Sequence, residues 1–183
     1  MSIRTVFWVF MSLVLAGTLV LVAGVMIILP DLPPTSKVRN IRLKEPLRIY
    51  TIDGRLMGEF GDERRITVSI KDTPDQLIEA ILAAEDDRFF KHHGVDFSGV
   101  IRAIIANLRS RDSRQGASTI TMQVARNYFL SREKTYSRKI KEVLLALRLE
   151  RELTKAQILE LYLNKIFLGH RAYGFQAAAA IYY

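Results

Sequence analysis

The 183-residue chain contains no cysteine, so disulfide bonds and thiolate metal sites are excluded. Proline is also scarce: there are five, and four of them fall within residues 30–46. No internal repeat is present, and the sequence therefore gives no sign of a repeat architecture. With 49% hydrophobic residues, the chain is long enough for one domain with a real core and one additional segment.

Charged residues are missing from one long segment. No Asp, Glu, Lys or Arg occurs between Arg4 and Asp31, and residues 6–29 are almost entirely apolar. About 20 apolar residues span the hydrocarbon core of a bilayer as a helix. A cleaved signal peptide has a shorter apolar core, of roughly 7–15 residues, and a small-residue cleavage site that is not evident before Pro30. We therefore expect residues 6–29 to be an uncleaved transmembrane anchor and residues 1–5 to be a short cytoplasmic N-terminus.

The charge of the remaining chain is basic, with a formal net value of +8. This balance suits anionic lipid headgroups, a phosphorylated substrate or nucleic acid. Beside a membrane anchor we favour lipid or phosphate, and we expect no nucleic-acid partner. Basic residues follow the apolar span, which counted naively would leave the body of the protein in the cytoplasm, but long domains translocate largely regardless of charge. Charge alone leaves both orientations open.

Residues 30–71 are expected to form a linker and a small β element. The prolines mark residues 30–46 as the linker. Two strand-like runs then surround Asp53 and Gly54, a tight-turn signal, and residues 64–70 offer a third strand. We interpret this β element as a connector rather than a site.

Residues 72–183 are expected to form a mainly α-helical domain. After a first helix near residue 74, the apolar periodicity predicts helices at about 97–108, 118–128, 136–152 and 155–168. The last of these has Thr154 and Gln157 in capping-box spacing, with Gly169 just past its end. A polar loop is predicted at 109–116.

The first helix of this domain carries acids in an unusual place. Asp72 or Thr73 is placed to cap it, and Pro74 suits its first turn. Its apolar stripe consists of Leu77, Ile78, Ile81 and Leu82. At about 100° per residue, Glu85 falls inside this stripe and Asp86 at its edge. A carboxylate withdrawn from water favours its protonated form, which suits a group that must accept a proton near neutral pH.

A second acid, Glu142, lies in apolar surroundings on the helix predicted at 136–152. The main stripe of that helix consists of Ile140, Val143, Leu144 and Leu147. Glu142 projects from the opposite side, among Leu145, Ala146 and Leu149, and a helix that is apolar on both sides is typical of a buried one. Arg138 and Lys139 precede the acid by about one turn. Paired carboxylates are the usual equipment for chemistry at the anomeric carbon of a sugar, although ordinary ion pairs would explain the same residues.

Two adjacent histidines, His92 and His93, also attract attention. No helical His-x-x-x-His spacing supports a pair of metal ligands. We therefore favour capping or packing over metal binding for both.

Four motifs follow one another in the order and spacing of a known family. They are EDDRFFKHHGVD (85–96), RQGASTITMQVARNYFL (114–130), RKIKEVLLALRLE (138–150) and KAQILELYLNKIFLG (155–169). The chain resembles the peptidoglycan glycosyltransferases of glycosyltransferase family 51, as found in class A penicillin-binding proteins of the 1A type. The resemblance implies a lysozyme-like helical fold with a membrane-embedded jaw. It also implies that the enzyme polymerises lipid II into glycan strands with inversion, releasing undecaprenyl pyrophosphate, on the periplasmic side of the bacterial inner membrane.

The resemblance also implies roles for single residues. Glu85 matches the base that activates the 4-hydroxyl of the acceptor sugar, and Asp86 matches a supporting acid beside it. Glu142 matches the glutamate that helps the pyrophosphate leave, directly or through a divalent cation, Mg²⁺ or Mn²⁺. The positions that match substrate-binding and pyrophosphate-binding residues are Ser118, Thr119, Gln123, Arg126, Lys134, Arg138 and Lys139. The fourth motif contributes Lys155, Glu160 and Asn164, for which a structural role is equally open.

The sequence departs from the family pattern in two places. Met122 stands where the family often has a glutamine, so that a polar contact is lost there. The chain ends at Tyr183 inside a further family block, so we expect a truncated domain whose full-length parent also has a penicillin-sensitive transpeptidase domain. The expected partners are lipid II, the growing glycan strand, membrane lipids and other cell-wall synthesis proteins. Two alternatives remain open: a peptidoglycan-cleaving enzyme of the same fold, and a non-catalytic membrane-anchored fragment.

Overall fold

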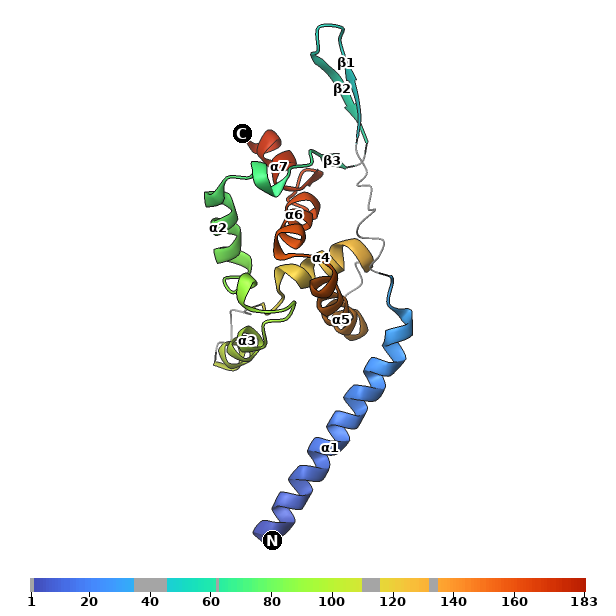
Figure 1. Cartoon of the computed structure of the whole chain (residues 1–183), viewed down its shortest axis with the longest axis vertical. Helices are drawn as coiled ribbons and strands as arrows, with labels where there is room; N and C mark the ends of the chain where they lie inside the picture. The colour runs from blue at the N-terminus through green and yellow to red at the C-terminus, as the bar shows by residue number, and fades with distance from the viewer. Residues whose placement is uncertain (1, 35–45, 62, 110–115, 132–134) are drawn as a thin grey trace.

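The computed structural model describes residues 2–34, 46–61, 63–109, 116–131 and 135–183. A helical body lies between two projections: a long helix at one end and a β-hairpin at the other (Figure 1). The long helix, α1 (Ile3–Ile28), continues as one short turn, η1 (Leu29–Asp31). It is long and apolar enough to cross a membrane, and no part of its most apolar window is buried. This agrees with the span predicted at residues 6–29.

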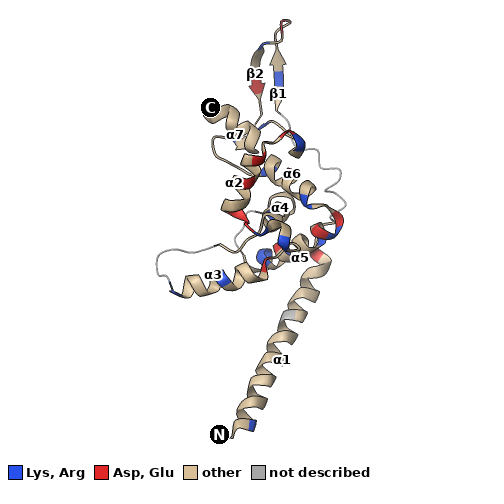
Figure 2. Ribbon diagram, turned by 60° about the vertical axis from the view of Figure 1, so that its left-hand side comes forward, with Lys and Arg blue, Asp and Glu red and all other residues tan. Residues whose placement is uncertain are grey.

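The charged residues lie mainly outside the apolar helix α1 (Figure 2). α1 carries none between Arg4 and Asp31, whereas acidic and basic residues are spread over the helical body. Where α1 meets the body, the Asp31 carboxylate lies 3.9 Å from Nζ of Lys141, on α5 (Tyr136–Glu152). The apolar helix therefore joins the body beside α5.

The predicted hairpin is confirmed. β1 (Leu47–Tyr50) pairs antiparallel with β2 (Leu56–Phe60), and Gly54 in the connecting turn has a φ of +80°. The predicted third strand is wrong beyond its first two residues. β3 (Arg64–Arg65) is short and pairs in parallel with β4 (Ala172–Tyr173) instead of extending the hairpin. The residues after it are bonded to side chains of α6 (Lys155–Lys165), so their backbone groups have partners without a sheet.

The body consists of helices, as predicted. Its elements are η3 (Ile70–Asp72), α2 (Asp75–Glu85), η4 (Phe89–Lys91), α3 (Phe97–Arg109), α4 (Ile120–Phe129), α5, α6 and α7 (Phe175–Tyr182). The main core is formed where α4 packs against α5 and α6. Its fully buried members include Ile120, Val124, Leu145, Leu149, Ile158 and Leu163. Burying such side chains stabilises the fold by roughly 1.5–3 kcal/mol each.

The predicted cap of α2 is wrong, and that of α6 is correct. Neither Asp72 nor Thr73 caps α2: the residue before that helix is Pro74, and the Thr73 hydroxyl donates to the Ser69 carbonyl oxygen instead. The capping box of Thr154 and Gln157 on α6 is confirmed.

The end of α6 also differs from the prediction. The helix stops at Lys165 rather than near residue 168, because the chain becomes extended at Ile166 and turns back to pair Phe167 with Tyr173. Gly169, with a φ of +90°, lies in that return turn, where its carbonyl accepts a hydrogen bond from the backbone N–H of Ala172. Gly169 therefore shapes a turn rather than a helix end.

Candidate active site

Glu85 is the last residue of α2, and its position differs from the prediction. The apolar stripe of α2 packs as expected, but Glu85 is exposed and Asp86 is buried. The helix ends at Glu85, and Asp86 leaves it with φ −162° and ψ 77°. A projection at 100° per residue therefore fails at this point. The expected withdrawal of Glu85 from water is wrong, and the carboxylate is available to a solvent-borne ligand.

Glu85 borders a cavity of about 690 Å³. Nε2 of Gln123 donates a hydrogen bond to its Oε2 over 2.7 Å, so the acid is held by α4. Other residues around this cavity include Asp86, Asp87, Arg102, Ser118 and Arg126. Three of the predicted binding residues, Ser118, Gln123 and Arg126, are thus brought together with the predicted base.

The buried Asp86 makes three close contacts. Its Oδ1 and Oδ2 lie 3.0 and 3.1 Å from Nε2 of His92, and Oδ2 also accepts the backbone N–H of Ile120 at 3.0 Å. Ile120 is the first residue of α4, so the carboxylate occupies the positive end of that helix. The packing role preferred for His92 agrees with this contact, while His93 is exposed.

Glu142 is almost completely buried, with 1% of its surface exposed, as predicted. Its carboxylate accepts hydrogen bonds from the Arg138 guanidinium and, at 3.1 Å, from Nζ of Lys139. The same Nζ lies 2.6 Å from Oγ of Ser118. Ser118 therefore borders the Glu85 cavity on one side and contacts the Glu142 cluster on the other. The two acids belong to one continuous site.

Of the two apolar faces predicted for α5, the one that carries Glu142 is the more deeply buried. Ile140, in the predicted main stripe, is 39% exposed, whereas Leu145, Ala146 and Leu149 beside Glu142 are inaccessible to solvent. The reason is that the Glu142 face packs against α4, at the centre of the core.

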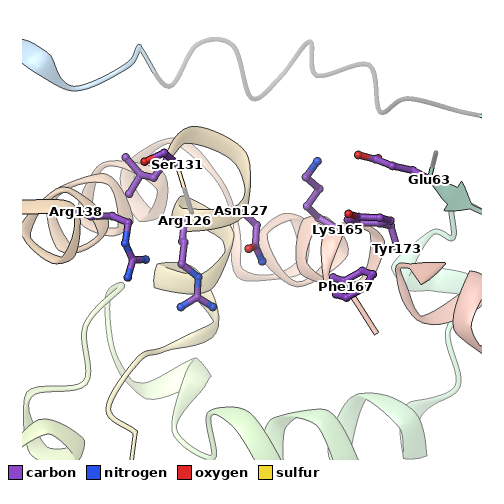
Figure 3. Close-up of a pocket in the computed structure, with 9 residues that line it drawn as sticks. Glu63, Arg126, Asn127, Ser131, Arg138, Lys165, Phe167 and Tyr173 are labelled. Atoms are coloured by element: carbon purple, nitrogen blue, oxygen red, sulfur yellow. The ribbon is translucent and has the colours of Figure 1, made fainter. Parts of the chain in front are cut away.

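A second cavity, of about 370 Å³, shares Arg126 with the first. Figure 3 shows the residues that line this second cavity. In the close-up, the guanidinium groups of Arg126 and Arg138 point to the same side, and Lys165, Phe167 and Tyr173 lie at the other end. The two rings are 5.1 Å apart. Arg126 borders both cavities, and within the described ranges no hydrogen bond to its guanidinium is found. Its charge is available to a bound anion.

The remaining predicted residues fall into two groups. Thr119 caps α4: its Oγ1 accepts the Met122 N–H and donates to the Gly94 carbonyl oxygen at 2.6 Å, so that its hydroxyl is used by the fold. Lys134 lies outside the described residues.

The fourth motif holds the fold together. Nζ of Lys155 contacts Glu150 at 2.7 Å and lies 4.3 Å from the centre of the Phe89 ring. The Glu160 carboxylate accepts the N–H of Ile70 at 2.9 Å. These contacts support a structural role for Lys155 and Glu160.

Asn164 contributes to the same framework. Its side chain both accepts from and donates to the backbone of Val68, over 2.8 Å in each case. A single amide thus fixes the segment that follows β3 against α6.

Several residues of the site were not identified from the sequence. Arg102 and the second-cavity residues Lys165, Phe167 and Tyr173 come from separate elements, and no spacing rule connects them to Glu85 or Arg126. Tyr162 is buried in the core near the base: burial, and then the charge of Glu85, raises the pKa of its hydroxyl. Only the tertiary fold brings these groups together.

The described residues do not form a ready metal site. Among them, no group of three His, Asp or Glu side chains is placed to hold an ion. Both oxygens of Glu142 are already engaged by Arg138 and Lys139. The side chains here suit an anionic ligand instead of a protein-bound cation.

Comparison with known proteins gives a consistent result. A family model described as "Transglycosylase" matches residues 53–183. The chain is 48% identical to penicillin-binding protein 1A of Pseudomonas aeruginosa over 182 residues, which are 99% of this chain and 22% of that protein. It is 53% identical to penicillin-binding protein 1A of Escherichia coli over 84% of the chain and 18% of that protein, and 45% identical to that of Neisseria gonorrhoeae over 99% and 23%. The chain spans about a fifth of the length of these relatives.

Proposed function

The chain belongs to the transglycosylase family, and on this premise we propose that it is a membrane-anchored peptidoglycan glycosyltransferase of bacterial cell-wall synthesis. It polymerises lipid II into glycan strands with inversion at the anomeric carbon and releases undecaprenyl pyrophosphate. The observation that carries the proposal is the continuity of one site from Glu85, through Ser118, to the Lys139–Glu142 pair.

Glu85 acts as the base. Its carboxylate is exposed to the cavity, where it can accept the proton from the 4-hydroxyl of the acceptor sugar as that oxygen attacks C1 of the donor. The hydrogen bond from Gln123 to Oε2 fixes the orientation of the carboxylate and leaves Oε1 for the substrate. A single displacement of this kind, without a covalent glycosyl-enzyme intermediate, inverts the configuration at C1.

The cations of the site serve the leaving group. A departing diphosphate develops negative charge, which preorganised positive groups stabilise in the transition state. Arg138 and Lys139 are held by the buried Glu142, and Arg126 faces the same region. Glu142 therefore assists departure by keeping two cations in place. We propose that a divalent cation, Mg²⁺ or Mn²⁺, would accompany the diphosphate and add to the positive charge that Arg126, Arg138 and Lys139 supply.

The second cavity suits the growing glycan strand. It begins at Arg126 and Arg138, beside the proposed diphosphate position, and continues to an aromatic pair on which sugar rings can pack. A strand held there would place its reducing-end sugar next to the cations, with the rest of the strand pointing away from α1.

Membrane attachment involves two elements. α1 would cross the inner membrane, and α3, at the same end of the body in Figure 1, would rest on the bilayer as the jaw. The face of α3 that would meet lipid consists of Phe97, Ile101, Ile104, Ile105 and Leu108, all exposed. The body then lies on the periplasmic side, where the lipid-linked sugar is reached at the surface.

The test is a polymerisation assay with lipid II in detergent micelles, on this chain and on the longer parent, which we propose to be bifunctional with a transpeptidase domain. Glycan polymer together with released undecaprenyl pyrophosphate is the expected result. Release of soluble muropeptides from finished cell wall, without a lipid-linked donor, would instead indicate a cleaving enzyme. Turnover by the parent alone would identify the shorter chain as a non-catalytic anchored fragment.

A further inference from the structure

We propose that His92 is a positioning residue: through Asp86 it fixes the end of α2 on the first turn of α4, and thereby sets where Glu85 stands. The kinetic part of this inference rests on the proposed function, whereas its structural part can be measured without any substrate.

The contact between His92 and Asp86 is buried and direct. The side chains of His92 and Asp86 are 6% and 4% exposed, and Nε2 lies at nearly equal distances from the two carboxylate oxygens. The Phe89 ring and the imidazole form a T-shaped pair, with ring centres 6.3 Å apart. A buried carboxylate needs all its donors, because an uncompensated charge away from water is costly. Asp86 has two such donors, Nε2 of His92 and the N–H of Ile120.

This pair determines the geometry on both sides of the cavity. Asp86 is bonded through the peptide link to Glu85, and Ile120 begins the helix whose next turn carries Gln123. Glu85 is thus held at two points on α4, by its own side chain and by the residue after it. A further tie, from Thr119 to the Gly94 carbonyl oxygen, attaches the same loop to the same helix end. Loss of the His92 contact would therefore shift Glu85 without detaching the loop.

The imidazole serves orientation and not proton transfer. Nε2 is the ring nitrogen that faces the Asp86 carboxylate, so Nδ1 is the one left for any other partner. That atom is buried and has no hydrogen-bond partner among the described residues. His92 also lines neither the 690 Å³ cavity nor the 370 Å³ cavity. His92 therefore acts through Asp86.

Two near-isosteric replacements separate this role from simple packing. In His92→Gln the side-chain amide nitrogen falls near the position of Nε2 and can still donate to Asp86. In His92→Asn the amide falls near the position of Nδ1 and cannot reach it. His93→Asn is the matched control, because His93 is the exposed neighbour.

Hydrogen exchange of the Ile120 amide, measured on the full chain in detergent, reports directly on the hydrogen bond from this amide to Asp86. We expect His92→Asn to accelerate exchange about tenfold, and His92→Gln and His93→Asn to leave it near the wild-type rate. With lipid II, His92→Asn should lower kcat by about 10–100-fold with KM within about twofold, as misplacement of a reacting group does, and His92→Gln should retain most of the activity.

The proposal would be overturned if Ile120 exchanged at the same rate in His92→Asn and His92→Gln. It would also be overturned if these two variants lost kcat equally and in proportion to their drop in Tm. A wild-type chain without lipid II turnover would count against the proposed function only. In that case the exchange of Ile120 in the two variants still decides whether His92 positions Asp86.

Discussion

The side chain of Gln123 donates a hydrogen bond to the Glu85 carboxylate over 2.7 Å, and so the proposed base is oriented by a residue 38 positions further along the chain. The contact joins the end of α2 to the second turn of α4, the helix that also carries Arg126. The base and one of the cations for the leaving group therefore share a single rigid support.

Replacing Glu85 with Gln should lower polymer formation by about 10²–10⁴-fold, the usual contribution of a general base. The amide cannot accept the proton of the acceptor hydroxyl. Because Glu85 is exposed, the thermal unfolding midpoint should stay close to that of the wild type. Glu79→Gln, on an exposed position of the same helix, is the control and should polymerise normally. Undiminished activity of Glu85→Gln would refute the assigned role.

Lys139→Met should reduce kcat by about 10²-fold, since it removes a cation from the site of the departing diphosphate. The change also leaves the buried Glu142 with Arg138 as its remaining partner. Because Lys139 is 45% exposed, we expect a loss of about 1–2 kcal/mol in unfolding free energy rather than the 3–5 kcal/mol typical of a fully buried pair. Arg148→Met, an exposed position on the same helix, should alter neither quantity.

Gly94→Ala should destabilise the fold by about 2–4 kcal/mol, measured by denaturant unfolding. Gly94 has a φ of +88°, and a Cβ there would lie 2.9 Å from the carbonyl oxygen of Ala146. Gly54→Ala provides the comparison, because Gly54 also has a positive φ but its Cβ would meet open space. It should cost only about 1 kcal/mol. Equal losses in the two variants would show that close packing at Gly94 does not matter.

Acidification should weaken α3 through Asp96. A hydrogen bond from the Ser98 hydroxyl is the main cause that lowers the pKa of this carboxyl below its usual 3.8, with the Gly99 N–H and Arg88 adding to it. A lowered folded-state pKa means that the ionised form stabilises the fold above pH 3.8, and that this contribution is lost as the pH falls through the lower value. The melting temperature of Asp96→Asn should therefore differ most from that of the wild type above about pH 4, and the difference should shrink below it. A gap that does not change with pH would contradict the assignment.

The parts of the structure that follow from local sequence were predictable. The apolar span, the hairpin turn at Gly54 and the capping box of Thr154 each depend on a few neighbouring residues, and the structure contains all three. Burial of Glu142 was also predictable, since the apolar residues around it share its face of one helix.

The exchange of environments between Glu85 and Asp86 could not be predicted in this way. Helical projection assumes that the helix continues, but the chain leaves it at Asp86, whose carboxylate finds its partners on His92 and Ile120. Likewise, the buried Arg65 donates to the carbonyl oxygen of Asn164, a residue 99 positions away. Contacts of this kind depend on the assembled fold and have no local pattern.

Arg126 gives the site one final property. Arg126 lines both cavities, so an anionic ligand bound in one cavity lowers the positive electrostatic potential in the other. By thermodynamic reciprocity, each occupant changes the affinity of its neighbour by the same factor. Two anionic ligands, one in each cavity, would therefore compete for the charge of Arg126. When one of them dissociates, the binding affinity for the other increases.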